Sequence, residues 1–201
     1  YKVRPYEVEK GSANALYQKW RVFLKEELKS LSLSRFNRNV RNIVKEFSEF
    51  PVLDIKKPRV GLVGEILVKF HPVANNDIIG LLENEGCEVV VPDLMGFFYY
   101  VCSHGKTKSE LLYLSKKKAF AENMAVKLIK AMEGSYRKAV KGTKFGCPGD
   151  IFEMREMVRP IVSPGNIAGE GWFLSAEMLE LIHDGVPNIV CMQPFACLPN
   201  H

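Results

Sequence analysis

The stretch that decides the fold reads "RVGLVGEILVKFHPVANNDIIGLLENEGCEVVVPD" and covers residues 59–93. Its first part, residues 59–66, is a short apolar run interrupted by glycines, which is typical of a buried strand. Residues 77–86 have the apolar spacing of a helix, and Gly86 is placed to end that helix in a left-handed conformation. Residues 87–93 begin with a second apolar run. Strand, helix and strand in this order predict a βαβ unit, and such units build parallel sheets with right-handed crossovers.

The end of the chain repeats part of this pattern. Residues 171–185 have the spacing of a helix that Gly185 ends, and residues 186–192 follow as an apolar strand. We therefore expect both regions to contribute strands to one parallel sheet. The fold class predicted from these patterns is α/β, with a Rossmann-like parallel sheet and flanking helices.

The middle of the chain is expected to be helical. Residues 109–134 place apolar side chains on one face and most lysines elsewhere, as in an amphipathic helix. Residues 141–150 are expected to form a loop. Residues 151–162 predict a short helix that Pro160 breaks.

A helical hairpin is expected ahead of the α/β part. Apolar positions recur at helical spacing over residues 12–31, with Ser12 as the candidate N-cap, and again over residues 36–47. We divide the chain into an N-terminal helical segment, residues 1–57, and a Rossmann-like domain, residues 58–201. Because the chain starts without a methionine and stops within a loop, we interpret it as a piece of a longer polypeptide, truncated within the second domain.

Composition excludes several classes of protein. The 201 residues are 47% hydrophobic and 25% charged, with a net charge of +5, as in an ordinary globular protein. The lysines of the central helix lack interleaved aromatic residues, so we interpret them as a solvated face and expect no nucleic-acid partner. No apolar run approaches the ~20 residues needed to cross a bilayer, and we expect no membrane partner. Five cysteines without a CxxC pair argue against a disulfide framework, and a cytoplasmic location is expected.

Two loops are expected to meet at one edge of the sheet. The segment "EILVKFHPVANN" leaves the end of the first strand, and "QPFACLPNH" leaves the end of the last one. In open parallel α/β sheets, ligands bind beyond the carboxyl ends of the strands. This edge is therefore where we expect the chemistry.

Cys197 is the strongest candidate for a functional residue within these loops. It stands between Pro194 and Pro199 just past a strand, so its thiolate is a candidate ligand for a metal or an iron–sulfur cluster. The alternative is an ordinary loop cysteine. Cys147, in "FGCPGD", has a similar setting and is a second candidate metal ligand. The remaining cysteines lie in or near apolar segments and are interpreted as packing residues: Cys87, Cys102 and Cys191.

The loop after the first strand carries the other candidates. Glu65 and His71 are the candidate catalytic residues, and Lys69 and Asn75 are candidate cofactor-binding residues at the entry to a helix, where backbone N–H groups suit an anion. The alternative is structural: Asn76 or Asp77 caps the helix, and Glu65 hydrogen-bonds the turn. No second ligand is suitably spaced to make His71 a zinc ligand.

A glycine-rich stretch, "GNIAGEGWFL", leads into the last helix. It lacks the GxGxxG and GxxxxGK[ST] patterns, so neither dinucleotide nor nucleotide phosphate binding is indicated. Its glycines are explained by a tight turn, and Glu170 and Trp172 are candidates to face the shared edge.

Two segments carry a resemblance to a known family. The stretch quoted above and "GNIAGEGWFLSAEMLELIHDGVPNIVCMQPFACLPNH" resemble the large CoA-enzyme activase-related proteins of anaerobic bacteria. In these, activase-like ATPase domains are fused to a module similar to the D-component of 2-hydroxyacyl-CoA dehydratases. The likeness runs from about Arg59 to His201, and the N-terminal "VRPYE" and helical hairpin also look like the segment that precedes this module.

The resemblance implies a cofactor and a reaction. Members of the dehydratase and benzoyl-CoA reductase group hold a [4Fe-4S] cluster through cysteines of more than one Rossmann-like domain. One ligand lies in a Cys-x-Pro loop, which Cys197-Leu198-Pro199 matches. An ATP-driven activase passes one electron to the cluster, which reduces the thioester carbonyl to a ketyl radical and permits loss of a β-hydroxyl. The family's other cysteine ligands and the activase's ATP-binding motif are not found in this sequence.

Two functional hypotheses follow. In the first, the chain is a fragment of an ATP-driven, iron–sulfur-dependent dehydratase-like or reductase-like protein, and it contributes one wall and one cysteine ligand of a [4Fe-4S] site. Its expected partners are an acyl-CoA substrate and an activase ATPase domain, in cis or in trans. The isolated fragment is expected to bind no cluster and to be inactive. In the second, the chain is a non-catalytic ligand-binding or docking module of an activase fusion protein.

Overall fold

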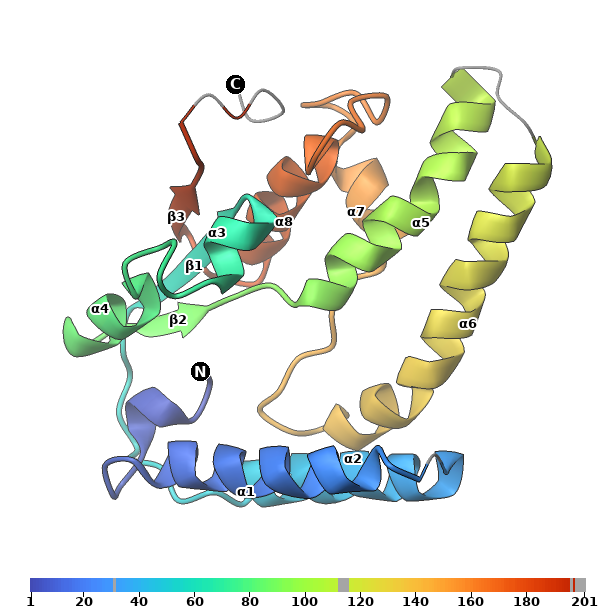
Figure 1. Cartoon of the computed structure of the whole chain (residues 1–201). Coiled ribbons are helices and arrows are strands. Elements are labelled where there is room, and N and C mark those ends of the chain that lie inside the picture. The colour runs from blue at the N-terminus through green and yellow to red at the C-terminus, as the bar shows by residue number, and fades with distance from the viewer. Residues whose placement is uncertain (31, 112–115, 196, 198–201) are drawn as a thin grey trace. The chain divides into compact units, whose positions relative to one another are not determined.

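The computed structural model describes the 201 residues except 31, 112–115, 196 and 198–201. The chain divides into two compact units (Figure 1). The first unit is Tyr1–Lys56 with Lys130–Cys147, and the second unit is Lys57–Ile129 with Pro148–His201. The first boundary lies one residue before the predicted one, whereas residues 130–147, predicted in the second domain, group with the N-terminal segment.

The first unit contains the expected helical hairpin. After the short 3-10 helix η1 (Arg4–Tyr6) come α1 (Ser12–Glu27) and α2 (Leu33–Ser48). The hairpin is antiparallel, because Lys19 and Trp20 of α1 both donate hydrogen bonds to Glu46 near the end of α2, at 2.8 and 3.1 Å. Ser12 is the first helical residue and not the N-cap, which is Gly11 with a positive φ of 90°.

The second unit is built on a three-stranded parallel sheet, which confirms the predicted α/β class with a Rossmann-like sheet. The strands are β1 (Arg59–Gly64), β2 (Glu88–Val90) and β3 (Asn188–Met192), in the order β2-β1-β3. In the register, Gly61 lies opposite Val90 of β2 and Ile189 of β3. The central strand β1 is almost entirely buried because both of its edges and both of its faces are covered.

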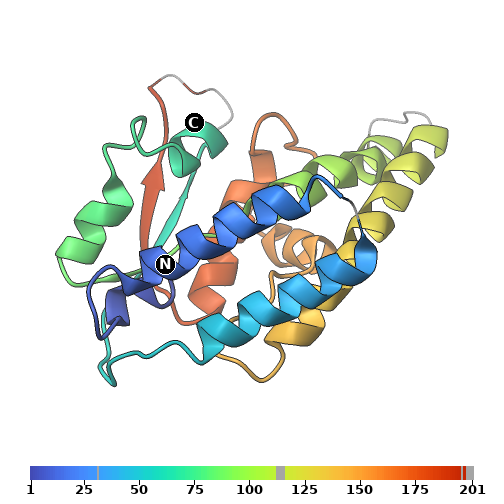
Figure 2. The same cartoon turned by 60° about the horizontal axis from the view of Figure 1, so that its bottom comes forward.

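Helices cover both faces of this sheet. Figures 1 and 2 show α4 (Ile78–Asn84) on one side of the strands and α8 (Gly171–His183) on the other. The glycines predicted to end these helices do so, since Gly86 and Gly185 have φ values of 86° and 74°. Gly61 lets α8 approach the sheet, because a Cβ at this position would lie 2.7 Å from a methyl carbon of Leu181.

Two helix predictions were wrong. The loop expected after β1 contains a short helix, α3 (Ile66–Phe70), because the carboxylate of Glu65 caps its first turn by accepting a 2.9 Å hydrogen bond from the N–H of Val68. The described residues of the single helix expected over residues 109–134 belong to two helices, α5 (Leu94–Leu111) and α6 (Lys116–Val140), and residues 112–115 lie outside the described residues.

The α5 helix was missed because its apolar residues do not follow a simple stripe. Its aromatic run includes Tyr99 and Tyr100, which are buried in a core cluster with Trp172 and Phe173 of α8. The Tyr100 and Phe173 rings stack with centroids 5.2 Å apart. The expected loop over residues 141–150 is present, and α7 (Ile151–Val158) ends before Pro160.

Within the described residues, no helix combines the length and the apolar character that crossing a membrane requires.

Candidate functional site

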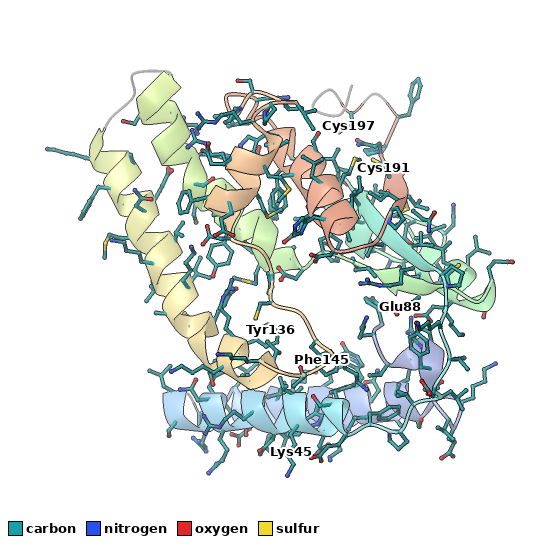
Figure 3. The ribbon with its side chains drawn as sticks, turned by 180° about the vertical axis from the view of Figure 1, so that it is seen from behind. Lys45, Glu88, Tyr136, Phe145, Cys191 and Cys197 are labelled. Atoms are coloured by element: carbon teal, nitrogen blue, oxygen red, sulfur yellow. The ribbon has the colours of Figure 1, made fainter. Side chains whose placement is uncertain are left out.

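The segments that follow β1 and β3 leave the same edge of the sheet, as predicted. Gly64 and Met192, the last residues of the two strands, lie opposite each other in the register. The next residue, Glu65, donates its backbone N–H to the carbonyl oxygen of Met192 at 3.0 Å. Figure 3 shows Cys191 and Cys197 at this end of the sheet. We call this end the carboxyl edge.

A glycine permits the close contact between the two strands. Gly64 has a φ of 144°, a conformation that side chains disfavour, and a Cβ there would overlap the carbonyl oxygen of Met192. The backbone of the carboxyl edge is thus fixed by Gly64 and by the hydrogen bond of Glu65.

Glu65, a candidate catalytic residue, has a structural role at this edge. Its side chain is half-buried, and one of its oxygens is the cap of α3. A second carboxylate lies beside it, because Glu170, which is buried, accepts a 3.1 Å hydrogen bond from the backbone N–H of Ile66. Glu170 therefore faces the carboxyl edge, as expected from the sequence, and it joins the start of α8 to the start of α3.

Lys69, a candidate cofactor-binding residue, points into the protein. Its side chain is 4% exposed and forms an ion pair with Glu177 of α8, which is 2% exposed, at 2.8 Å. Burial raises the pKa of Glu177 to about 7, and the neighbouring Lys69 opposes this shift. The ammonium group of Lys69 therefore pairs with Glu177 inside the core, and this pair holds α3 against α8.

Asn75 is buried and satisfies backbone groups. Its amide nitrogen donates to the carbonyl of Val68 at 2.9 Å, and its oxygen accepts from the N–H of Ile78, the first residue of α4, at 3.4 Å. The helix entry is thus tied by Asn75, and not by the side chain of Asp77, which forms no cap hydrogen bond.

His71, the other candidate catalytic residue, is exposed. Its Nδ1 accepts a hydrogen bond from the backbone N–H of Ala74 at 3.3 Å, which leaves the ring at the surface of the loop between α3 and α4. Of the four candidates in this loop, His71 is the one whose side chain is open to solvent.

Cys197 is half-buried, and its backbone N–H donates a hydrogen bond to the carbonyl oxygen of Pro194 at 3.2 Å. Cys147 is exposed and belongs to the first unit, where its sulfur lies 4.0 Å from the carbonyl oxygen of Arg137. The structure thus does not bring the two candidate metal ligands together within one unit.

The fit of a [4Fe-4S] cluster is limited by the number of ligands. Among the described residues, no three His, Cys, Asp or Glu side chains are grouped so as to hold a metal ion. A cluster of this kind is normally held by four cysteine thiolates. The described part of the chain therefore does not contain a complete cluster site, although it presents thiols at the carboxyl edge.

Sequence reasoning missed Cys191. It was interpreted as a packing residue, but it is exposed, because β3 is an edge strand of the sheet. The Gln193 amide nitrogen lies 3.3 Å from its sulfur and donates a hydrogen bond to it. The order of strands was the missing information, because an apolar run such as "NIVCM" looks the same in a central strand and in an edge strand.

A cluster of buried polar atoms near Glu170 was also not predicted from the sequence. Within the described residues, the Tyr100 hydroxyl and the Trp172 indole nitrogen are buried without a hydrogen-bond partner. Burial, and then the charge of Glu170, raises the pKa of Tyr100, which is therefore neutral. His104 packs edge-on against Tyr100, and burial, followed by the charge of Lys108, lowers its pKa to about 4. The only signal in the sequence was the aromatic run before His104.

Comparison with known proteins gave no match to a family model, to a curated protein or to a solved structure.

Proposed function

We propose that this chain is part of an ATP-driven iron–sulfur protein of the dehydratase-like or reductase-like type, in which it contributes one wall and the Cys197 ligand of a [4Fe-4S] site. The observation that carries the proposal is the meeting of the segments after β1 and β3, joined by the hydrogen bond from Glu65 to Met192. Cys197 follows β3, and in open α/β sheets ligands bind beyond the carboxyl ends of the strands, which supports a ligand role for this thiol.

Such a cluster, when bound, supplies single electrons of low potential. The chain's own residues would shape and exclude solvent from one side of it. Gly64 and the cap of Glu65 fix the backbone, and the buried pair of Lys69 with Glu177 holds α3 in place beside it. His71 lies exposed after α3, where it is available to a substrate such as an acyl-CoA.

At least two of the remaining ligands, and the ATPase, would come from outside the described residues. Cys147 is retained as a candidate ligand, since it is exposed in the first unit. The proposed location of such a protein is the cytoplasm, where thiols are kept reduced.

One observation favours the second candidate, a docking or ligand-binding module without catalysis. Lys69 and Asn75 were expected to bind a cofactor. Instead, their polar groups form an ion pair and hydrogen bonds with other groups of the protein. In that case Cys197 would be an ordinary loop thiol.

Iron analysis separates the two candidates. The full polypeptide that carries this chain is purified without oxygen, and iron and acid-labile sulfide per chain are measured for the wild type, Cys197→Ser and Cys87→Ser. Cys87 is the matched control because it is also half-buried but precedes β2, at the opposite edge of the sheet. We expect Cys197→Ser to lose most of its iron and Cys87→Ser to keep it. Full retention of iron in Cys197→Ser would support the docking module.

A further inference from the structure

We propose that the first unit binds double-stranded DNA through one face of α2, which is formed by Ser34, Arg38, Arg41, Asn42 and Lys45. We call this the basic face. The inference is independent of the proposed function, which rests on the sheet of the second unit. The expectation of no nucleic-acid partner was based on the lysines of the central helix, whereas the basic face lies on the N-terminal hairpin.

Positive charge is concentrated in the first unit. This unit carries 17 lysine and arginine residues and eight aspartate and glutamate residues, which gives a formal net charge of +9. The second unit carries 11 and 15 such residues and has a net charge of −4. The modest +5 of the whole chain therefore hides a strongly basic unit, and a charge of this size favours a polyanionic partner.

The basic face runs along one side of α2. Its five members follow one another at intervals of four, three, one and three residues, so they share one face of the helix, and all five are exposed. The helix packs through its other side, where Val44 is buried and the buried Asn39 donates a 3.3 Å hydrogen bond to Glu27 of α1. Figure 3 shows Lys45 on the side of the hairpin away from Tyr136 and Phe145 of the same unit.

Two arginines of this face are available to a ligand. Among the residues that the structure describes, Arg38 and Arg41 have no partner in a hydrogen bond or an ion pair. Lys45 lies 4.0 Å from Glu49, and both side chains are exposed, so this pair is weak. In contrast, Arg35 is half-buried and donates to the carbonyl oxygen of Ser30 at 3.1 Å, within the hairpin. The charges of Arg38 and Arg41 are thus not neutralised by the protein itself.

The side chains of the basic face are those that contact DNA. Arginine, lysine, serine and asparagine donate hydrogen bonds to phosphate oxygens, and arginine and asparagine also bind the edges of bases. From Ser34 to Lys45 the face is about 17 Å long, and the major groove of B-form DNA admits an α-helix.

The same composition argues against other polyanions. The basic face contains no large apolar side chain, whereas a helix that lies on a membrane inserts apolar side chains into it. Double-stranded RNA has a major groove that side chains cannot read. The observations therefore favour duplex DNA over an anionic membrane and over duplex RNA.

The test measures binding of a fluorescently labelled DNA duplex of about 20 base pairs by anisotropy over a range of salt concentrations. The full polypeptide that carries this chain is compared with Arg38→Ala/Arg41→Ala and with the control Lys127→Ala/Arg159→Ala, which removes two exposed cations from the second unit. We expect the first variant to raise Kd at least ~10-fold and to reduce the slope of log Kd against log salt by about two, because each phosphate contact contributes ~0.9. The control is expected to keep the wild-type slope.

A second variant and a second probe complete the test. Arg38→Lys/Arg41→Lys keeps both charges and is expected to bind DNA within a few-fold of the wild type, and it covers the case in which the alanine variant fails to fold. Vesicles of phosphatidylserine and phosphatidylcholine are the competing probe. Equal Kd values for wild type and a folded alanine variant would overturn the inference. So would a wild-type salt slope near zero, or tighter binding of the vesicles than of the duplex.

Discussion

At the residue scale, the ion pair of Lys69 with Glu177 shows how a surface-type residue becomes part of the core. Lysine and glutamate are rarely buried, and here both are almost completely buried and paired at 2.8 Å. Removal of one member leaves a charge without a partner, whereas removal of both leaves a space that apolar side chains can fill.

A double-mutant cycle tests this pair. At pH 8, we expect Lys69→Met and Glu177→Met each to lower the free energy of unfolding by about 3–5 kcal/mol, and the double variant to be near the wild type. Urea unfolding provides the measurement. A double variant that is as destabilised as the sum of the two single variants would show that the residues act independently.

The same pair predicts a dependence of stability on pH. The pKa of Glu177 is about 7 in the folded protein and has its ordinary value of about 4.5 in the unfolded chain, so between these values the folded protein holds the extra proton. The free energy of unfolding therefore falls as the pH rises through this window, with a slope from Glu177 of about 1.4 kcal/mol per pH unit. Glu177→Gln removes this slope. Stability profiles of wild type and Glu177→Gln that run parallel from pH 4.5 to 7 would contradict the prediction.

At the element scale, the short helix α3 was not predictable from periodicity, since five residues are too few to show a helical pattern. It exists because Glu65 caps it and because Lys69 and Asn75 tie it to α8 and α4. In contrast, α4, α8 and the parallel sheet were predictable, because terminating glycines and buried apolar runs are local signals.

The cap of α3 is tested by substitution of Glu65. We expect Glu65→Ala to lower the free energy of unfolding by about 1 kcal/mol, because the N–H of Val68 loses its partner. Glu65→Gln retains an acceptor oxygen and is expected to lose less. Thermal unfolding of the two variants provides the measurement, and equal losses would show that the capping oxygen is not the cause.

The site was only partly predictable. The direction of the strands was enough to predict that the two loops meet. The place of Glu170 at the start of a helix was enough to predict that it faces the carboxyl edge. The exposure of Cys191 and the burial of Lys69 depend on strand order and on packing between α3 and α8, which join residues far apart in the sequence.

At the scale of the whole molecule, each of the two compact units contains one of the chain's two tryptophans: Trp20 in the first and Trp172 in the second. Both side chains are buried, so the fluorescence of single-tryptophan variants, Trp172→Phe and Trp20→Phe, reports on each unit separately.

Two glycine-to-alanine substitutions, one in each unit, are expected to change the stability of their units in opposite directions. Gly64→Ala introduces a Cβ that overlaps Met192, so we expect it to destabilise the second unit by several kcal/mol. Gly134→Ala, in the part of α6 that belongs to the first unit, meets no atom within 4 Å and is expected to stabilise that unit by about 1 kcal/mol. Urea unfolding followed by each tryptophan gives the measurement. Equal shifts for both tryptophans in the Gly64→Ala background would contradict the division into units.

The central claim, that the carboxyl edge of the sheet presents the thiol of Cys197 to a metal centre, is tested most directly by alkylation of the cysteines in the full polypeptide. The protein, purified without oxygen, is treated with iodoacetamide before and after removal of iron, and each cysteine is quantified by mass spectrometry. We predict that Cys197 is protected while iron is bound and reacts once the iron is removed, whereas Cys87 reacts equally in both states. Equal reaction of Cys197 in the two states would contradict the claim.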